Sequence, residues 1–273
     1  MATERVPFYT VDAFTDTPFD GNPAAVCLDI DQLPESAMMA IAREMNLSET
    51  AFIYEPDDDG LRRLRWFTPA VEVPLCGHAT LASAHVLVRE LGAPGPIRFK
   101  SASGPLTVHE DRANTLRMDF PADPPSDHTA PDPLWNALGI EPGSGRYLIA
   151  RNLAVLVLED ADAVMAMRPD FGALGRVDLG DVMGLAVTAE GSGEVDFVSR
   201  FYAPWKGVDE DPVTGSAHTA LTPFWARELG KDELLAHQGL HRGGALTVRT
   251  RGDRVDLIGH AVTVAHGRLL RPA

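Results

Sequence analysis

Two pairs of neighbouring residues in this sequence combine proton-transfer chemistry with the expected start of a helix. His78 and Ser216 follow Gly77 and Gly215, and each side chain can exchange or donate a proton. A glycine at such a start lets the backbone approach a ligand closely. The alternative for Ser216 is ordinary helix capping. The symmetric placement of the two pairs favours a site over capping.

Two carboxylates lie upstream of these helix starts. Asp211 precedes Pro212, which disfavours the helical region and holds Asp211 as an extended turn residue facing the second start. Glu49 stands between an expected helix and an apolar strand, where partial desolvation would suit a carboxyl for acid-base work. A capping or surface role is the alternative for Glu49. Asp209 and Glu210 are interpreted as a solvated acidic loop.

The sequence of the helix that would position these groups occurs twice in the chain. Residues 77–92 and 215–230 both begin with Gly and end with Arg-Glu-Leu-Gly, at an offset of 138 (215 minus 77). Two similar halves are therefore predicted, each delivering one helix start to a common cleft that would bind a small carboxylate. Two further pairs flank the helices in the same order: residues 65–69 with 200–204, and residues 22–26 with 152–156.

Length and composition limit the classes of function. A repeat spacing of about half of the 273 residues favours two domains, predicted as residues 1–125 and 126–273 with the boundary in a stretch rich in Pro and Asp. The net charge of -15 argues against a nucleic-acid partner, because phosphate binding needs basic patches. No apolar run is long enough to span a membrane, and no signal peptide is expected.

Cysteine usage points to the cytoplasm. The sequence holds only Cys27 and Cys76, with no Cys-x-x-Cys spacing, so neither a disulfide framework nor a zinc knuckle is available. A racemase that needs one thiol in each half is excluded, because both cysteines lie in the first half. Cys76 is interpreted as a small buried residue, with a reactive thiol at the helix start as the alternative.

Strands dominate the expected secondary structure. One helix is expected from Pro34 to Asn46 and a short one around Pro133 to Leu138, in addition to the repeated pair. The end of the chain is interpreted as successive hairpins with turns at Gly252-Asp253 and His266-Gly267. The expected strands are residues 6–14, 24–30, 51–54, 61–67, 97–100, 106–110, 115–120, 146–158, 184–189, 194–202, 245–249 and 255–257.

The motifs together resemble the phenazine-biosynthesis PhzF-like family, whose fold is shared with diaminopimelate epimerase. The resemblance covers nearly the whole chain. It implies an α+β fold of two pseudo-symmetric β-barrel-like domains, each wrapped around a central helix, with the active site in the interdomain cleft. The motifs are Val11-Asp-Ala-Phe14 with Gly21-Asn-Pro23, Asn46-Leu-Ser-Glu49, Phe67-Thr-Pro69, Glu72-Val-Pro-Leu-Cys-Gly-His78 and Asp211-Pro-Val-Thr-Gly-Ser216.

The resemblance also implies a chemistry. The family reaction isomerises trans-2,3-dihydro-3-hydroxyanthranilate by moving a proton, without metal or organic cofactor. Glu49 would be the proton shuttle, with His78, Asp211 and Ser216 completing the catalytic set, and a homodimer is expected. An epimerase without the two-cysteine pair and a non-catalytic carboxylate-binding protein are the alternatives. The expected substrate-binding residues are Asn22, Cys76, Gly77, Thr214 and Gly215.

No metal or nucleotide cofactor is expected. His237 and His241 are spaced as metal ligands on a helix would be, but the residues between and after them do not sustain a helix. They are interpreted as part of a surface loop. No Gly-x-Gly-x-x-Gly follows a strand, and there is no phosphate-binding loop.

Overall fold

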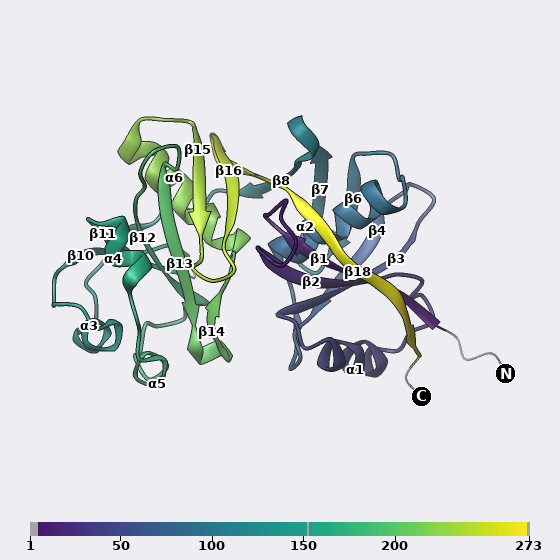
Figure 1. Ribbon diagram of the computed structural model, residues 1–273, viewed down its shortest axis with the longest axis horizontal. Helices are drawn as coiled ribbons and strands as arrows, with labels where there is room; N and C mark the ends of the chain where they lie inside the picture. The colour runs from purple at the N-terminus through teal and green to yellow at the C-terminus, as the bar shows by residue number, and fades with distance from the viewer. Residues whose placement is uncertain (1–4, 152, 272–273) are drawn as a thin grey trace. The chain divides into compact units, whose positions relative to one another are not determined.

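A computed structural model describes residues 5–151 and 153–271 of the chain (Figure 1). Asn152, the counterpart of Asn22 in the sequence repeat, lies outside the described residues. Contacts along the chain group it into two compact units. The N-terminal unit holds Met1–Asp119 together with Ile258–Ala273, and the C-terminal unit holds Phe120–Leu257.

The N-terminal unit is built mainly of strands. Its elements are β1 (Arg5–Ala13), β2 (Asn22–Cys27), α1 (Glu35–Met45), β3 (Glu49–Pro56), β4 (Arg62–Phe67), β5 (Glu72–Val73), α2 (Gly77–His85), the π-helical η1 (Val86–Glu90), β6 (Ile97–Ser101), β7 (Gly104–Glu110), the 3-10 turn η2 (Arg112–Asn114), β8 (Leu116–Pro121) and the last strand β18 (Ala261–Leu270).

The C-terminal unit is likewise built mainly of strands. Its elements are β9 (Ser126–Asp127), α3 (Asp132–Leu138), β10 (Gly145–Ile149), β11 (Leu153–Leu158), α4 (Ala161–Ala166), α5 (Phe171–Leu174), β12 (Gly184–Glu190), β13 (Phe197–Ala203), η3 (Pro204–Lys206), β14 (Val208–Asp211), η4 (Gly215–Ala217), α6 (His218–Leu229), β15 (Glu233–Gln238), β16 (Gly244–Arg251) and β17 (Arg254–Gly259).

The two units share one pattern of strand pairing. In the N-terminal unit β1–β2, β3–β4 and β6–β7 are antiparallel, and β2–β3 and β4–β6 are parallel. In the C-terminal unit β10–β11, β12–β13 and β15–β16 are antiparallel, and β11–β12 and β13–β15 are parallel. The short strands β5 and β14 each pair antiparallel with the strand before them. The sequence repeat therefore encodes a repeated topology.

The repeated helices are the centres of their units. Every residue from Gly77 to Ala84 in α2 is buried, because small and apolar side chains cover the whole circumference of the helix. In the C-terminal unit, Trp225 of α6 stacks on Phe197 at 5.8 Å between ring centroids and donates a hydrogen bond to Thr188 Oγ1 at 3.0 Å. Each helix is thus held by strands of its own unit.

The end of the chain differs from the sequence-based expectation. The Gly252-Asp253 turn is confirmed between β16 and β17, but the turn expected at His266-Gly267 is wrong, because β18 runs straight through it. A Cβ at residue 267 would lie 2.9 Å from the ring of Phe8, so glycine here accommodates an aromatic neighbour on the paired strand. Pairing with β1 also places β18 in the N-terminal unit, whereas the predicted boundaries assigned it to the second domain.

Irregular and short elements account for the other differences. The expected strand 146–158 is two strands, β10 and β11, which pair with each other. Short elements that carry little periodicity were not predicted, among them β5, β9, β14, α4 and α5. The expected helix of residues 34–46 is confirmed as α1, which ends where Asn46 adopts a left-handed conformation with φ 49°.

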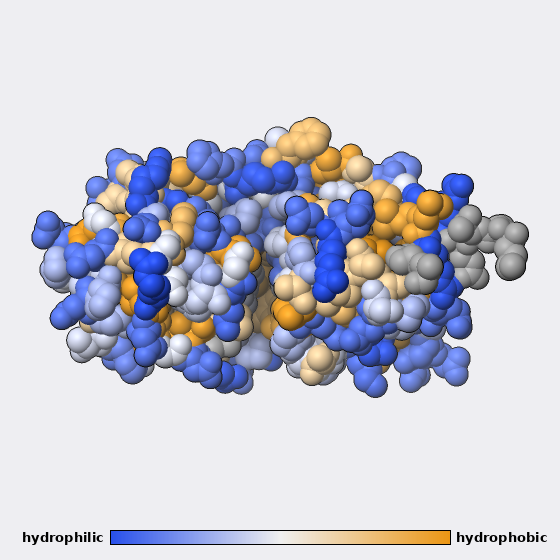
Figure 2. Space-filling model, turned by 90° about the horizontal axis from the view of Figure 1, so that it is seen from below, coloured by the Kyte–Doolittle hydropathy of each residue, from blue (hydrophilic) through white to orange (hydrophobic). Residues whose placement is uncertain are grey.

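Polar side chains prevail on the face drawn in Figure 2, where hydrophobic residues occur in small groups scattered among hydrophilic ones. None of the described helices combines the length and the apolar character that a membrane crossing requires.

The central position of α2 leads to a stability prediction. Leu81 is fully buried, so Leu81→Ala should lower the free energy of unfolding by about 2–5 kcal/mol through lost contacts and the cavity left behind. The same change at Leu91, which is 51% exposed, should alter it by no more than about 0.5 kcal/mol. Urea unfolding of both variants measures the difference. Equal stability of the two variants would contradict the packing described for α2.

Candidate active site

The N-terminal half of the predicted site converges at the start of α2. Glu49 is the first residue of β3 and pairs in register with Ala24 of β2, two residues after Asn22. His78 is the second residue of α2, which packs against β2 and β3. The parallel pairing of β2 and β3 therefore brings residues from three separate motifs together.

A chain of contacts joins these residues and sets the direction of their protons. Ser48 Oγ donates to Asn22 Oδ1 at 3.1 Å, which orients the amide, and Asn22 Nδ2 lies 3.2 Å from His78 Nδ1. An amide nitrogen can only donate, so Nδ1 of His78 is the acceptor and the neutral ring carries its proton on Nε2. Nε2 in turn lies 3.3 Å from Glu49 Oε2.

The side chains in this series of contacts differ in how far they are buried. Asn22 is fully buried, and the side chain of His78 is 5% exposed, whereas that of Glu49 is 18% exposed. Nε2 of His78 is buried and makes no aligned hydrogen bond within the described ranges. Among the amide, the imidazole and the carboxylate, Glu49 is therefore the group that a molecule outside the protein can reach. The Asn22 amide, which was predicted to bind substrate, has its partners inside the protein.

Cys76 is the residue before α2 and contacts the same histidine. Its Sγ lies 3.5 Å from His78 Nδ1, the residue is 7% exposed, and its side chain does not cap the helix. Burial alone raises the pKa of Cys27 to about 12, so that thiol stays protonated and inert. The expected burial of Cys76 is confirmed, and its place beside His78 at the helix start agrees with the sequence.

Glu49, Cys76 and His78 also form a possible metal-binding group. One donor atom from each lies within 4.8 Å of the others, and carboxylate, thiolate and imidazole are all zinc ligands. A ligating imidazole normally donates its second N–H to an acceptor. Here Nδ1 faces the N–H of Asn22, which leaves the ring proton on the nitrogen beside Glu49. The arrangement suits proton transfer better than metal ligation.

The C-terminal half of the predicted site forms where β14 leads into η4. Asp211 ends β14, and Thr214 is the residue before the turn Gly215–Ala217. Thr214 Oγ1 donates a short hydrogen bond to Asp211 Oδ2. Asp211 and Ser216 are half-buried, whereas Thr214 and Gly215 are buried. The capping alternative for Ser216 is wrong, because Ser216 lies inside η4 and its carbonyl accepts from Thr219 Oγ1 at 2.8 Å.

An Arg–Glu ion pair precedes each helix start. Arg65 Nε and Nη2 donate to the two oxygens of Glu72 at 2.7 and 2.6 Å, and Arg200 donates in the same way to Glu210 at 2.8 and 2.7 Å. The hydrogen bond from Arg65 lowers the pKa of Glu72. Each Glu stands five residues before its glycine, Gly77 (77 minus 72) or Gly215 (215 minus 210).

These two ion pairs, the Arg–Glu clamps, hold equivalent hairpins. Each links a long strand to the short strand that returns toward the helix, β4 to β5 and β13 to β14. Each arginine also lies over the ring two residues on, Phe67 at 5.0 Å or Tyr202 at 5.2 Å. The interpretation of Glu210 as part of a solvated acidic loop is wrong, because Arg200 is 3% exposed and needs a counter-charge.

His218, the first residue of α6, contacts the backbone just before the turn η4. Its Nδ1 lies 3.0 Å from the carbonyl oxygen of Thr214, which can only accept, so Nδ1 carries the ring proton. Burial is the main cause that lowers the pKa of His218 to about 4. The ring is therefore neutral at neutral pH and holds the backbone of Thr214 in place.

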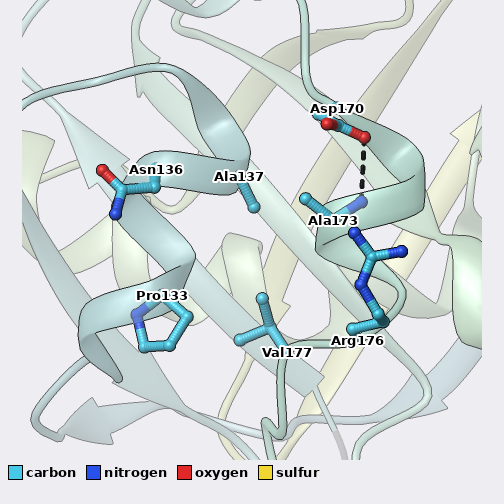
Figure 3. Close-up of a pocket in the computed structure, with 7 residues that line it drawn as sticks. All are labelled: Pro133, Asn136, Ala137, Asp170, Ala173, Arg176 and Val177. Carbon is cyan, nitrogen blue, oxygen red and sulfur yellow. Dashed lines mark hydrogen bonds between the residues drawn. The ribbon is translucent and has the colours of Figure 1, made fainter.

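A surface hollow elsewhere in the C-terminal unit does not involve these residues. It has a volume of about 440 Å³ and lies between α3 and the segment around α5 (Figure 3). Its only carboxylate, Asp170, points Oδ1 at the backbone N–H of Ala173 at 2.8 Å and so caps α5. None of the sequence-predicted site residues lines it. The residues that do are Pro133, Asn136, Ala137, Asp170, Ala173, Arg176 and Val177.

Comparison with known proteins places this arrangement in a family. The model of the phenazine biosynthesis-like proteins, PhzC-PhzF, matches residues 11–267. The chain belongs to the phenazine biosynthesis-like family. An uncharacterized isomerase of Pseudomonas aeruginosa is 48% identical over 97% of this chain and 98% of its own length. Membership at this level supports an isomerase.

Solved structures agree with the family fold. The crystal structure of a PhzF-family protein from Enterococcus faecalis has a TM-score of 0.90 and 41% identity, and the match covers 97% of this chain and 99% of that one. A hydroxyproline epimerase from Agrobacterium vitis has a TM-score of 0.63 and 12% identity, and covers 99% and 94%. The second match extends the likeness in fold to epimerases. The phenazine biosynthesis-like fold is thus mixed, with large sheets and few helices.

Sequence reasoning missed the residues that support the site. Ser48 belongs to the motif that contains Glu49, so the motif itself could have indicated a role for Ser48. Gln238, a buried residue whose Oε1 accepts from the backbone N–H of Thr214 at 3.0 Å, gave no signal, because the stretch containing His237 was interpreted as a surface loop. That interpretation is wrong for His237, which lies in β15 and pairs with Ala245 of β16. Arg200 and His218 are buried side chains that contact Glu210 and the carbonyl oxygen of Thr214. A sequence pattern does not reveal such contacts.

The direction of the proton on His78 can be tested by Asn22→Asp. Aspartate keeps the shape of asparagine but presents an acceptor to Nδ1, so Nδ1 should carry a proton in the variant. Nitrogen-15 shifts of labelled histidine rings, assigned with a His78→Asn variant, measure the tautomer. The same change at the exposed Asn136 should leave the ring unaltered. Unchanged His78 shifts in Asn22→Asp would refute the assignment.

Burial of His218 predicts a pH-dependent stability. Between pH 6.5 and about 4 the unfolded chain binds a proton that the folded chain does not, so stability falls as pH falls through this window. The full difference is about 3 kcal/mol. His218→Asn keeps a donor near the Thr214 carbonyl and should flatten the profile, whereas His241→Asn, at an exposed site, should not. Urea unfolding at several pH values gives the profiles, and identical slopes in all three proteins would contradict the account.

Proposed function

We propose that this protein is an isomerase that moves a proton within a small carboxylate substrate, with Glu49 as both acid and base. The observation that carries the proposal is the exposure gradient along the contact chain. Its amide and imidazole are buried, whereas its carboxylate, the one acidic group of the contact chain, is partly exposed to solvent. A base held in this way stays on one face of the substrate and can take up a proton and return it.

The proposed reaction is balanced without an oxidant or a cofactor. Glu49 Oε takes a proton from a carbon next to an electron-withdrawing group, and the C–H electron pair enters the conjugated system. The protonated Glu49, whose acidic proton can exchange with water, then delivers a proton to another carbon of that system. Nε2 of His78 lies 3.3 Å from Glu49 Oε2, and its N–H is proposed to turn to the carboxylate form as a donor. Bonds to hydrogen are broken and formed in equal number.

Substrate binding is proposed to involve both helix starts. The first turn of α2 has no side-chain cap, so its backbone N–H groups and dipole favour an anion. In the C-terminal half, the half-buried Ser216 hydroxyl is proposed to bind the substrate, and Asp211 to act as a second acid-base group. The predicted cleft that would bring both halves to one substrate is part of this proposal.

An epimerase is the second candidate, favoured by the fold shared with the hydroxyproline epimerase. Epimerisation needs bases on opposite faces of one carbon. Cys27 cannot supply one, because burial raises the pKa of its thiol to about 12. Glu49 or Cys76 would therefore work against Asp211. A binding protein without catalysis is the remaining alternative.

Exchange with deuterated water tests the proposal. Purified protein is incubated with trans-2,3-dihydro-3-hydroxyanthranilate and with trans-4-hydroxy-L-proline, and deuterium is located by NMR. Label at a new carbon supports the isomerase, and label with inverted configuration supports the epimerase. Binding of these carboxylates without exchange would sink both enzymatic candidates.

The role of Glu49 can be tested with any substrate that exchanges. Glu49→Gln should slow exchange by about 10²–10⁴-fold, because the amide cannot take up a proton, and should leave binding largely intact. Glu44→Gln makes the same change at an exposed position of α1 and should leave the rate unaltered. Exchange at the native rate in Glu49→Gln would exclude Glu49 as the shuttle.

A further inference from the structure

We propose that Gln238 is a positioning residue that fixes the hydroxyl proton of Thr214 on the carboxylate of Asp211. The inference rests on the proposed function only in taking Asp211 as a site residue. Gln238 is the last residue of β15 and is fully buried. A buried amide must have its donors and its acceptor matched, so the partners of Gln238 define its orientation.

Three hydrogen bonds fix the amide of Gln238. Its Oε1 accepts from the backbone N–H of Thr214 at 3.0 Å, and this donor can only face an oxygen. Nε2 therefore lies on the other side, where it donates to the carbonyl oxygen of Asp211 and to Thr214 Oγ1, each at 3.0 Å. One side chain thus ties both ends of the segment from Asp211 to Thr214.

The amide also decides what the Thr214 hydroxyl does. Because Gln238 donates to Oγ1, the hydroxyl uses its oxygen as an acceptor there and turns its own proton elsewhere. That proton goes to Asp211 Oδ2 in a short hydrogen bond. One carboxylate oxygen of Asp211 is thereby given a fixed donor. Gln238 thus orients the carboxylate of Asp211 through Thr214, because its own side chain bonds the backbone of Asp211 and not the carboxylate.

The fold delivers Gln238 to this place through β13. That strand pairs with β14 at Phe201 and Asp211 and with β15 at Ser199 and Gln238. Gly239 follows with φ +93°, and a Cβ there would lie 2.5 Å from the carbonyl oxygen of Pro212. A glycine is therefore required for the end of β15 to approach the segment so closely.

The C-terminal half then uses the same device as the N-terminal half. In each, a fully buried amide, Asn22 or Gln238, donates to a neighbour and thereby leaves the proton of that neighbour on the side of a carboxylate. The neighbour is His78 in one half and Thr214 in the other. The amides come from unrelated positions of the repeat, so the sequence similarity of the halves does not produce this likeness.

Three variants separate positioning from packing. Gln238→Glu keeps the acceptor for Thr214 N–H but presents an acceptor to Oγ1, so the hydroxyl should turn to Glu and leave Asp211. Gln238→Met keeps the volume and removes all three hydrogen bonds. Thr214→Val removes only the hydroxyl and leaves Gln238 in place. Gln32→Glu, at an exposed position of the N-terminal unit, is the matched control for the added charge.

Two readouts need no substrate. The carbon-13 carboxyl resonance of Asp211 should shift in all three variants and stay unchanged in Gln32→Glu. Amide hydrogen exchange at Thr214 should become at least about tenfold faster in Gln238→Met and stay near the native rate in Gln238→Glu. An Asp211 resonance that shifts in Thr214→Val but not in folded Gln238→Glu or Gln238→Met protein would overturn the inference.

The activity readout is kept separate from the structural one. With a substrate that exchanges, Gln238→Glu should lower kcat by about tenfold or more and change KM by less than about threefold. A raised KM with native kcat would also overturn the inference. If the native protein exchanges no substrate, the proposed function fails, while the Asp211 resonance still decides the role of Gln238.

Discussion

The hydrogen bond between the Asn22 amide and Nδ1 of His78 is the interaction on which the N-terminal half-site depends. An amide nitrogen has no lone pair to offer, so it dictates which ring nitrogen accepts and which carries the proton. From this follow the direction of Nε2–H toward Glu49 and the poor match to a metal ion. The strands that hold Asn22 and Glu49 in register matter because this contact tolerates little displacement.

The duplicated sequence supplies a scaffold, and the proposed chemistry rests on the differences between the copies. Both units share strand pairing, a buried central helix and an Arg–Glu clamp five residues before the helix start. The groups placed on this scaffold differ, with Glu49 and His78 in one half and Asp211 and Ser216 in the other. A pair of equivalent thiols is absent, since both cysteines, Cys27 and Cys76, lie in the first half of the sequence. One-sided proton transfer fits these differences better than a symmetric mechanism.

Much of the fold could be predicted because it is encoded locally. The helix start at Gly77, the end of α1 at Asn46 and most strands follow from periodicity and from residues that favour particular backbone conformations. Glu49 and His78 could be predicted as partners because motifs mark both. The fate of Gly267 could not, because a glycine that marks a turn and a glycine that accommodates a ring look alike in sequence. The prediction for Glu210 failed for a similar reason, since strand pairing brings its partner Arg200 to it.

By itself the sequence determined the repeat, the helix starts and the chemical types available at each of them, because these depend on neighbours along the chain. Tertiary structure alone decided which atoms face one another. It buried Asn22 and Gln238 and left Glu49 partly exposed, and it placed β18 beside β1. The physical reason is that burial and hydrogen-bond direction depend on groups distant in sequence, and these two properties determine where a proton resides.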